Sequence, residues 1–250
     1  MTPDWDVEEA GINGFPALRQ VVCGGWLVRI SGGPRRTANS ATPLPGAPAG
    51  PEAPIEACEA LYRRHRRPAI FRIPSFLDPE IDRRLAARGY TAEGHSCVLH
   101  GPLAAVAAAA DPAGVRLAGR PDRAWLAAMA RLQNQTAAQH AVYRRIVAAV
   151  MLPAAFAALD GEAGIAALAY GVIHRGHLCY ESVVTDPGQR RRGHARRVLA
   201  ALAAWAGAYE ASRACLQVEA DNAPARALYD AVGMSAEAHR YFYRREPAAR

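Results

Sequence analysis

The chain has 250 residues, of which 51% are hydrophobic, and a formal net charge of +7 at pH 7. This length suits one large domain or two of ordinary size. No uninterrupted apolar run reaches the roughly 20 residues needed to cross a bilayer, since the longest, residues 146–159, is too short and contains Pro153. The first residues, MTPDWDVEEAG, are acidic and lack the basic and apolar regions of a secretion signal, so we expect a cytoplasmic protein without a membrane partner.

The cysteines favour buried, reduced thiols. Their odd number leaves no complete disulfide framework, and none forms a CxxC pair. The histidines do not pair with them at metal-ligand spacing, so we expect no structural metal. The five positions are Cys23, Cys58, Cys97, Cys179 and Cys215.

The arginines are spread along the chain and include three separate runs, YRRHRR, QRRRGHARR and YRREPAAR. Such runs could contact nucleic acid, but the chain has no lysine-rich tail and no RNA-binding aromatic signature. A ligand carrying several phosphates would use the same surface equally well, and YRRHRR is most simply a solvated face. We therefore expect no nucleic-acid partner.

The first half of the chain alternates strand and helix patterns. The expected elements, in order, are an amphipathic segment at 6–20, a strand at 21–31, a second strand paired with it in RRTANSA, a Pro/Gly/Ala-rich loop at 42–53, the helix IEACEALYRRH, a strand at 69–73, a helix from Pro79 closed by Gly89, and the strand TAEGHSCVLHG. An alanine-rich connection at 102–114 follows, and we place the domain boundary there.

The second half predicts a longer series of elements. They are the strand VRLAG, the helices DRAWLAAMARLQ and AAQHAVYRRIVAAV, the strands MLPAAFAAL, IAALAYGVI and HLCYESVVT, the helix RRVLAALAAWAGAY, the strand ACLQVEA, the helix APARALYDAV and the terminal segment YFYRR. Short turns join the three consecutive strands, which should therefore be antiparallel neighbours.

An internal repeat suggests two related halves. Residues 69–99 align with residues 214–243 with a single gap, so that Pro79 falls on Pro224 and Gly89 on Gly233. Each copy predicts a strand, a helix and a strand in the same order. We expect an N-terminal domain over residues 1–108 and a second domain over residues 113–250.

Only the second half contains the stretch GQRRRGHARR, which leads from a strand into a long helix. The first backbone NH groups of a helix lack internal partners, and with the helix dipole they form a site for anionic oxygen. Gly193 removes a side chain where the backbone must approach a ligand closely, and the neighbouring arginines attract negative charge. Phosphate is the ligand that best uses both features.

This stretch resembles the acyl-CoA-binding signature of the GNAT superfamily of N-acetyltransferases, Arg/Gln-x-x-Gly-x-Gly/Ala, which Arg190, Gly193 and Ala195 match. Downstream, Asn222 to Tyr229 followed by Gly233 looks like that family's second motif, with Met234 in place of the usual aromatic residue. The resemblance extends over residues 113–243. It implies a mixed α/β fold with a mostly antiparallel sheet flanked by helices, and an N-terminal half that is a degenerate GNAT-like copy without the CoA signature.

The resemblance also implies acetyl-CoA as co-substrate and a set of binding residues. Asn222 could cap its helix, contact the cofactor or do both, and His194 contacts phosphate only if its side chain turns inward rather than into solvent. The expected cofactor-binding residues are Val183, Val184, Thr185, Gln189, Arg190, Arg191, Arg192, Gly193, His194, Ala195, Asn222 and Tyr229.

For catalysis, the resemblance places Tyr229 near the thioester sulfur as the proton donor, with aromatic packing as the alternative. Backbone NH groups of residues 182–185 would stabilise the oxyanion. Glu181 and Glu219 are the candidate general bases, although a solvated or ion-paired strand residue is the simpler interpretation of each.

The implied reaction moves an acetyl group from acetyl-CoA to a primary amine by direct attack. We expect a small metabolite or amino-acid-like acceptor, because the N-terminal half could wall off one side of the pocket. Alternatives are a protein amino terminus or lysine as acceptor, and a non-catalytic CoA-sensing module. The sequence leaves the oligomeric state open, with a homodimer among the alternatives.

Overall fold

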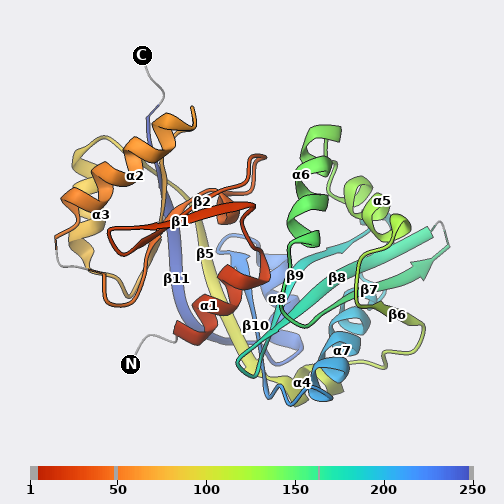
Figure 1. The fold of residues 1–250 in the computed structure, drawn as a ribbon. Helices are drawn as coiled ribbons and strands as arrows, with labels where there is room; N and C mark the ends of the chain where they lie inside the picture. The colour runs from red at the N-terminus through yellow and green to blue at the C-terminus, as the bar shows by residue number, and fades with distance from the viewer. Residues whose placement is uncertain (1–4, 48–49, 163, 248–250) are drawn as a thin grey trace. The chain divides into compact units, whose positions relative to one another are not determined.

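The computed structural model describes residues 5–47, 50–162 and 164–247, which form two compact units (Figure 1). Unit 1 contains the chain up to Pro16 together with Val98–Ala238, and unit 2 contains Ala17–Cys97 together with the chain from His239 onward. The boundary expected at residues 108–113 does not coincide with this division, because two long strands, β5 and β11, each pass from one unit to the other. As a division between sequence repeats, that boundary stays a prediction.

Unit 2 is a sheet with the strand order β1-β2-β3-β4-β11-β5. Its strands are β1 (Arg19–Cys23), β2 (Trp26–Ile30), β3 (Ala41–Pro43) and β4 (Ile70–Pro74), with parts of β5 (Thr91–Pro102) and β11 (Ala236–Arg245). Its helices are α2 (Glu52–Arg64), α3 (Pro79–Ala87) and the short 3-10 turn η1 (Arg36–Ala38). The helices predicted to start near residue 55 and at Pro79 are confirmed.

Two details of unit 2 differ from the sequence expectation. The single strand predicted over residues 21–31 is a hairpin, because Gly24 and Gly25 have φ angles of 57° and 80° and form a two-residue turn between β1 and β2. The strand predicted in RRTANSA is instead η1, and the strand that pairs with β2 is β3. Consequently β3 occupies the start of the loop predicted at 42–53. Residues 48–49 of that loop lie outside the described residues.

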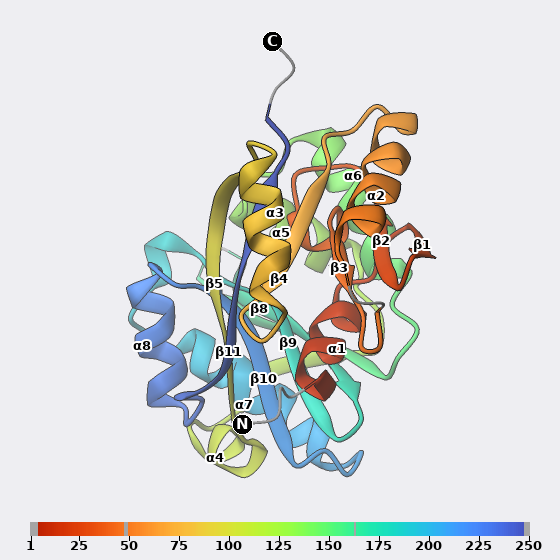
Figure 2. The same cartoon turned by 90° about the vertical axis from the view of Figure 1, so that its left-hand side faces the viewer.

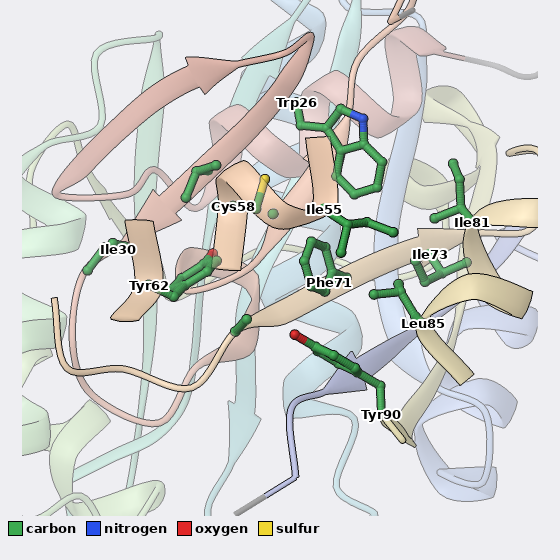
Figure 3. Packing of buried hydrophobic residues seen from close by; sticks show 13 residues of the cluster. Trp26, Ile30, Ile55, Cys58, Tyr62, Phe71, Ile73, Ile81, Leu85 and Tyr90 are labelled. Carbon is green, nitrogen blue, oxygen red and sulfur yellow. The ribbon is translucent and has the colours of Figure 1, made fainter. Parts of the chain in front are cut away.

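The core of unit 2 lies between the sheet and α2 and α3 (Figures 2 and 3). Trp26 and Phe71 from neighbouring parts of the sheet meet edge to face at 5.6 Å, and Phe71 meets Tyr90 at 5.5 Å. The helices contribute a fully buried apolar row to the same cluster: Ile55, Cys58, Tyr62, Ile81 and Leu85. Burial of these side chains holds both helices on one face of the sheet.

Within unit 1 the strand order is β5-β10-β9-β8-β7-β6. Its further strands are β6 (Val115–Ala118), β7 (Ala154–Gly161), β8 (Gly164–His174), β9 (His177–Thr185) and β10 (Arg213–Glu219). Its helices are α1 (Trp5–Gly14), α4 (Leu103–Ala108), α5 (Arg123–Leu132), α6 (Ala137–Ala148), α7 (His194–Gly207) and α8 (Ala223–Ala231), with the 3-10 turn η2 (Pro187–Gln189). The antiparallel pairing of β7, β8 and β9 is confirmed.

Helices cover both faces of the unit 1 sheet (Figure 1). The amphipathic segment expected at 6–20 is helical only as α1, which packs on β8 and β9. Tyr170 on β8 donates its hydroxyl hydrogen to the carbonyl of Gly14 at 2.9 Å and so fixes the end of α1. The α7 helix packs on β7, β8 and β9 through a row of buried alanine and leucine residues.

The repeat seen in the sequence is also a repeat of elements, since β4-α3-β5 and β10-α8-β11 occur in the same order. Within unit 2, residues 241–245 of β11 pair with β4 in antiparallel register. The last strand of the second copy therefore completes the sheet of unit 2. The predicted fold class, a mixed and mostly antiparallel sheet flanked by helices, is confirmed.

The five cysteines are free, with Cys23 partly exposed and the other four buried. Across the described ranges, no helix has both the length and the apolar character to span a membrane.

A close backbone approach in unit 1 requires glycine at position 101. An alanine Cβ there would lie 2.0 Å from the carbonyl oxygen of Gly233. We expect Gly101→Ala to lower the free energy of unfolding by about 2 kcal/mol, since the backbone must shift. Gly119→Ala is the matched control, because its Cβ would meet open space. Equal thermal unfolding of the two variants would contradict this packing.

Candidate functional site

The candidate site begins where β9 and β10 part. These parallel strands pair only over residues 177–180 of β9 and 213–216 of β10. Beyond that ladder, β9 continues to Thr185 and β10 to Glu219. The carboxyl ends of two parallel strands that separate are where α/β sheets open a crevice for a ligand.

A bulge in β9 lies at the point of separation. Tyr170 of β8 is opposite Glu181 and Leu168 is opposite Val184, so one residue of β8 faces two residues of β9. Ser182, one of those two, has a φ of 55°, which is unusual for a residue with a side chain. Such a bulge increases the local twist and turns the end of β9 away from its former line.

The loop after β9 is held by Asp186. Its carboxylate accepts a hydrogen bond from the Gly188 backbone at 3.0 Å and forms an ion pair with Arg131 of α5 at 2.8 Å. The pKa of Asp186 is lowered, first by the hydrogen bond from Arg131 and then by that from the Gly188 NH. These contacts fix the turn η2 and direct the chain toward α7.

Gly193 occupies the N-cap of α7 with a φ of 79°, and an added Cβ would have no heavy atom within 4 Å. Gly193 is therefore needed for its backbone conformation and leaves space above the helix start. Arg191, two residues earlier, also has a positive φ, of 66°. The loop thus presents its backbone to an open space at a helix N-terminus.

These elements enclose a groove of about 630 Å³. All of the predicted cofactor-binding residues line it except Arg192, which forms an ion pair with Glu162 at 3.0 Å instead. The lining consists of Val183, Val184, Thr185, Gln189, Arg190, Arg191, Gly193, His194, Ala195, Arg196, Asn222, Pro224, Ala225, Ala227, Leu228 and Tyr229. Sequence reasoning did not assign Arg196, Pro224, Ala225, Ala227 or Leu228 to the site. Arg196 could have been found from its position one helical turn after Gly193.

The groove is electropositive. Arg190, Arg191 and Arg196 line it, and no carboxylate does so among the described residues. With the helix N-terminus, these guanidinium groups suit a ligand that carries several negative charges.

His194 and Asn222 settle two geometric alternatives left open by the sequence. His194 lines the groove rather than facing solvent, and both of its ring nitrogens are buried without a hydrogen-bond partner in the described part of the chain. Asn222 caps α8 by accepting a hydrogen bond from the Ala225 NH at 3.2 Å, and it also lines the groove.

Tyr229 lies at the α8 side of the groove and is only 7% exposed. Burial, with a smaller contribution from the negative charge of Glu181, raises the pKa of Tyr229 to about 12. The hydroxyl is protonated at neutral pH even with an ordinary pKa of about 10, and the burial makes it a weaker acid.

The two candidate bases have different surroundings, and neither lines the groove itself. Glu181 is partly buried, and its side chain lies beside Gly14 and the Cys179 thiol. Glu219 is exposed at the end of β10. Among the described residues, no group of three or more His, Cys, Asp or Glu side chains could hold a metal ion.

Solved structures share this fold. A GCN5-related N-acetyltransferase from Kribbella flavida is 16% identical, with a TM-score of 0.71 over 100% of this chain and 98% of that chain. A tandem GNAT protein from the clavulanic acid biosynthesis pathway is 18% identical, with a TM-score of 0.65 over 84% of this chain and 76% of that chain. A putative GNAT-family acetyltransferase from Novosphingobium aromaticivorans is 18% identical, with a TM-score of 0.59 over 99% and 97% of the two chains. The chain therefore shares the fold of these GNAT-family structures.

A family model described as "Probable histone acetyltransferase Rv0428c C-terminal" matches residues 5–244. Because the match covers nearly the whole chain, the protein belongs to this family of acetyltransferases. No curated protein matches the sequence. The expected resemblance to the GNAT superfamily is thus confirmed, and it extends over both halves of the chain.

The lowered pKa of Asp186 makes a prediction about pH. A carboxylate with a folded-state pKa below its unfolded value of about 3.9 stabilises the fold above that value, and this stabilisation is lost as the pH falls through the folded-state pKa. We expect Asp186→Asn to melt below the parent at pH 7, with the difference shrinking below about pH 4. Arg131→Gln, which removes the partner, should lose the same pH dependence. A melting difference that is constant with pH would contradict this role.

Proposed function

We propose that this protein transfers an acetyl group from acetyl-CoA to the primary amine of a small metabolite or amino-acid-like acceptor. The observation that carries the proposal is the groove itself, which joins an arginine-lined helix N-terminus to the buried hydroxyl of Tyr229 along the parted end of β9. Family membership supports acetyl transfer in general.

The residues of the groove fit the chemical parts of acetyl-CoA. The backbone around Gly193 and the start of α7 would hold the pyrophosphate, assisted by Arg190 and Arg191. Val183, Val184 and Thr185 would lie along the pantetheine arm, because the opening between β9 and β10 lets an extended chain enter beside them. The imidazole of His194 would gain the hydrogen-bond partner that it lacks.

Direct attack requires a neutral amine, a polarised carbonyl and a proton for the departing sulfur. Backbone NH groups in residues 182–185 would stabilise the negative charge on the thioester oxygen. The amine nitrogen bonds to the carbonyl carbon, the carbon–sulfur bond breaks, and Tyr229 gives its proton to the thiolate. A free thiol has a pKa of about 8.5, so this proton accelerates the reaction without being obligatory.

Glu181 is the better supported of the two candidate bases. It lies one residue before the bulge, and its negative charge contributes to the raised pKa of Tyr229. From there the carboxylate could take a proton from the incoming ammonium group, directly or through water. Glu219 is exposed at the end of β10 and does not line the groove.

Helix α1 supports a small acceptor. It packs on β8 and β9, and Gly14 at its end lies beside Glu181. This helix narrows the approach to the proposed base on that face of the sheet. A protein amino terminus or lysine would need an open groove there.

Calorimetric titration with acetyl-CoA tests the cofactor assignment. We expect the parent to bind and Arg190→Ala to weaken binding about tenfold, because it loses a charge-assisted contact with phosphate. Arg192→Ala is the matched control: it removes the same charge two residues away, but that side chain faces Glu162 outside the groove. Equal weakening by both variants would show a general charge effect. No binding by the parent would overturn the proposal.

Tyr229→Phe tests the chemistry. With an amine that the parent acetylates, found by following thiol release across a panel of small amines, we expect kcat to fall about 10- to 100-fold, since proton transfer is lost. The affinity for acetyl-CoA and the melting temperature should change little. An unchanged kcat would make Tyr229 a packing residue. Tight binding by the parent without transfer to any amine would instead support the CoA-sensing alternative.

A further inference from the structure

Ser182 has a strained backbone conformation that no other residue of β9 shares. A residue with a side chain is disfavoured at a φ of 55°, and such strain persists only when the surroundings hold the backbone in place. The bulge is also what turns β9 at the point where it leaves β10. Some contact must therefore keep Ser182 in this conformation.

That contact comes from α6. The hydroxyl of Tyr143 donates a hydrogen bond to Oγ of Ser182 at 3.0 Å. Tyr143 is 4% exposed and Ser182 is half-buried, so this bond is only partly accessible to water. It joins a helix to the single strained residue of β9.

The ring of Tyr143 is itself fixed by aromatic packing. Phe15 lies 6.2 Å away, centroid to centroid, and Trp125 of α5 stacks almost parallel to it at 6.5 Å. The Trp125 indole NH donates to the carbonyl of Ala157 in β7 at 2.9 Å. The hydroxyl of Tyr143 is thus aimed from a rigid scaffold, as a positioning group requires.

We infer that Tyr143 is a positioning residue that holds Ser182 in its left-handed conformation, and through it aims the backbone NH groups at the end of β9 toward the acyl carbonyl oxygen. This inference rests on the proposed function of the groove. Tyr143 does not line the groove and touches no reacting atom, so it acts only through Ser182. Its hydroxyl restricts the backbone conformation at Ser182, and its ring contributes to packing.

Tyr143→Phe is the first test, with acetyl-CoA and the amine that the parent uses. We expect kcat to fall about tenfold, because small misplacements of catalytic groups are costly. Affinity for CoA, which has no acyl oxygen, should stay within about twofold, whereas the preference for acetyl-CoA over CoA should fall. Tyr62→Phe is the matched control, because it removes another buried hydroxyl, one that donates to the carbonyl of Arg29 within unit 2 and lies outside the groove. It should lower the melting temperature similarly and leave kcat unchanged.

A rescue separates positioning from packing. Glycine adopts positive φ without strain, so Ser182→Gly should keep the bulge without help from Tyr143. We expect the double variant Tyr143→Phe/Ser182→Gly to recover most of the kcat and of the preference for acetyl-CoA. Failure of this rescue, or an unchanged kcat in Tyr143→Phe, would overturn the inference.

The affinities for acetyl-CoA and CoA distinguish a failure of this inference from a failure of the proposed function. If the parent binds acetyl-CoA more tightly than CoA but transfers nothing, the proposed function fails. The preference for acetyl-CoA in Tyr143→Phe then still decides the role of Tyr143, because an unchanged preference would overturn the inference.

Discussion

Two parallel strands leave a crevice between them only where their hydrogen-bond ladder ends, and in this protein that point is fixed at Tyr180 and Leu216. Beyond it, the bulge at Ser182 turns β9 away from its line. The loop that follows starts from this turned strand, and so the position of α7 depends on it as well. The groove is therefore a consequence of a local backbone conformation, and the helices around it supply its walls.

The two ends of the groove offer a ligand different chemical environments. Toward α7, backbone freedom at Gly193, a helix N-terminus and arginines give a site for negative charge. Toward α8, the groove ends at the buried and protonated hydroxyl of Tyr229, whose pKa is raised by burial to about 12. A ligand with phosphates at one end and a reactive thioester at the other would meet a suitable environment at each end. This is the basis for proposing acetyl-CoA rather than a nucleic acid, which would need only the basic end.

The repeated strand-helix-strand unit has diverged between the two copies. The second copy, β10-α8-β11, contributes Asn222 and Tyr229 to the groove, whereas the first copy, β4-α3-β5, follows no arginine-glycine loop. The closing strand of the second copy pairs with β4 in unit 2. Unit 2 therefore cannot complete its sheet from a continuous stretch of chain, which explains why the compact units do not follow a simple division of the sequence.

The sequence by itself determined most elements and eleven of the sixteen residues that line the groove, because periodic apolar patterns, caps and the Arg190–Ala195 spacing are local features. It could not distinguish a long strand from a hairpin at Gly24 and Gly25, since both contain the same apolar residues. Tertiary structure alone decided that His194 turns inward, that Arg192 faces Glu162, and that Tyr143 reaches Ser182. Each of these depends on which side chains from distant segments meet, and the bulge at Ser182 arises from strand pairing that no short stretch of sequence encodes.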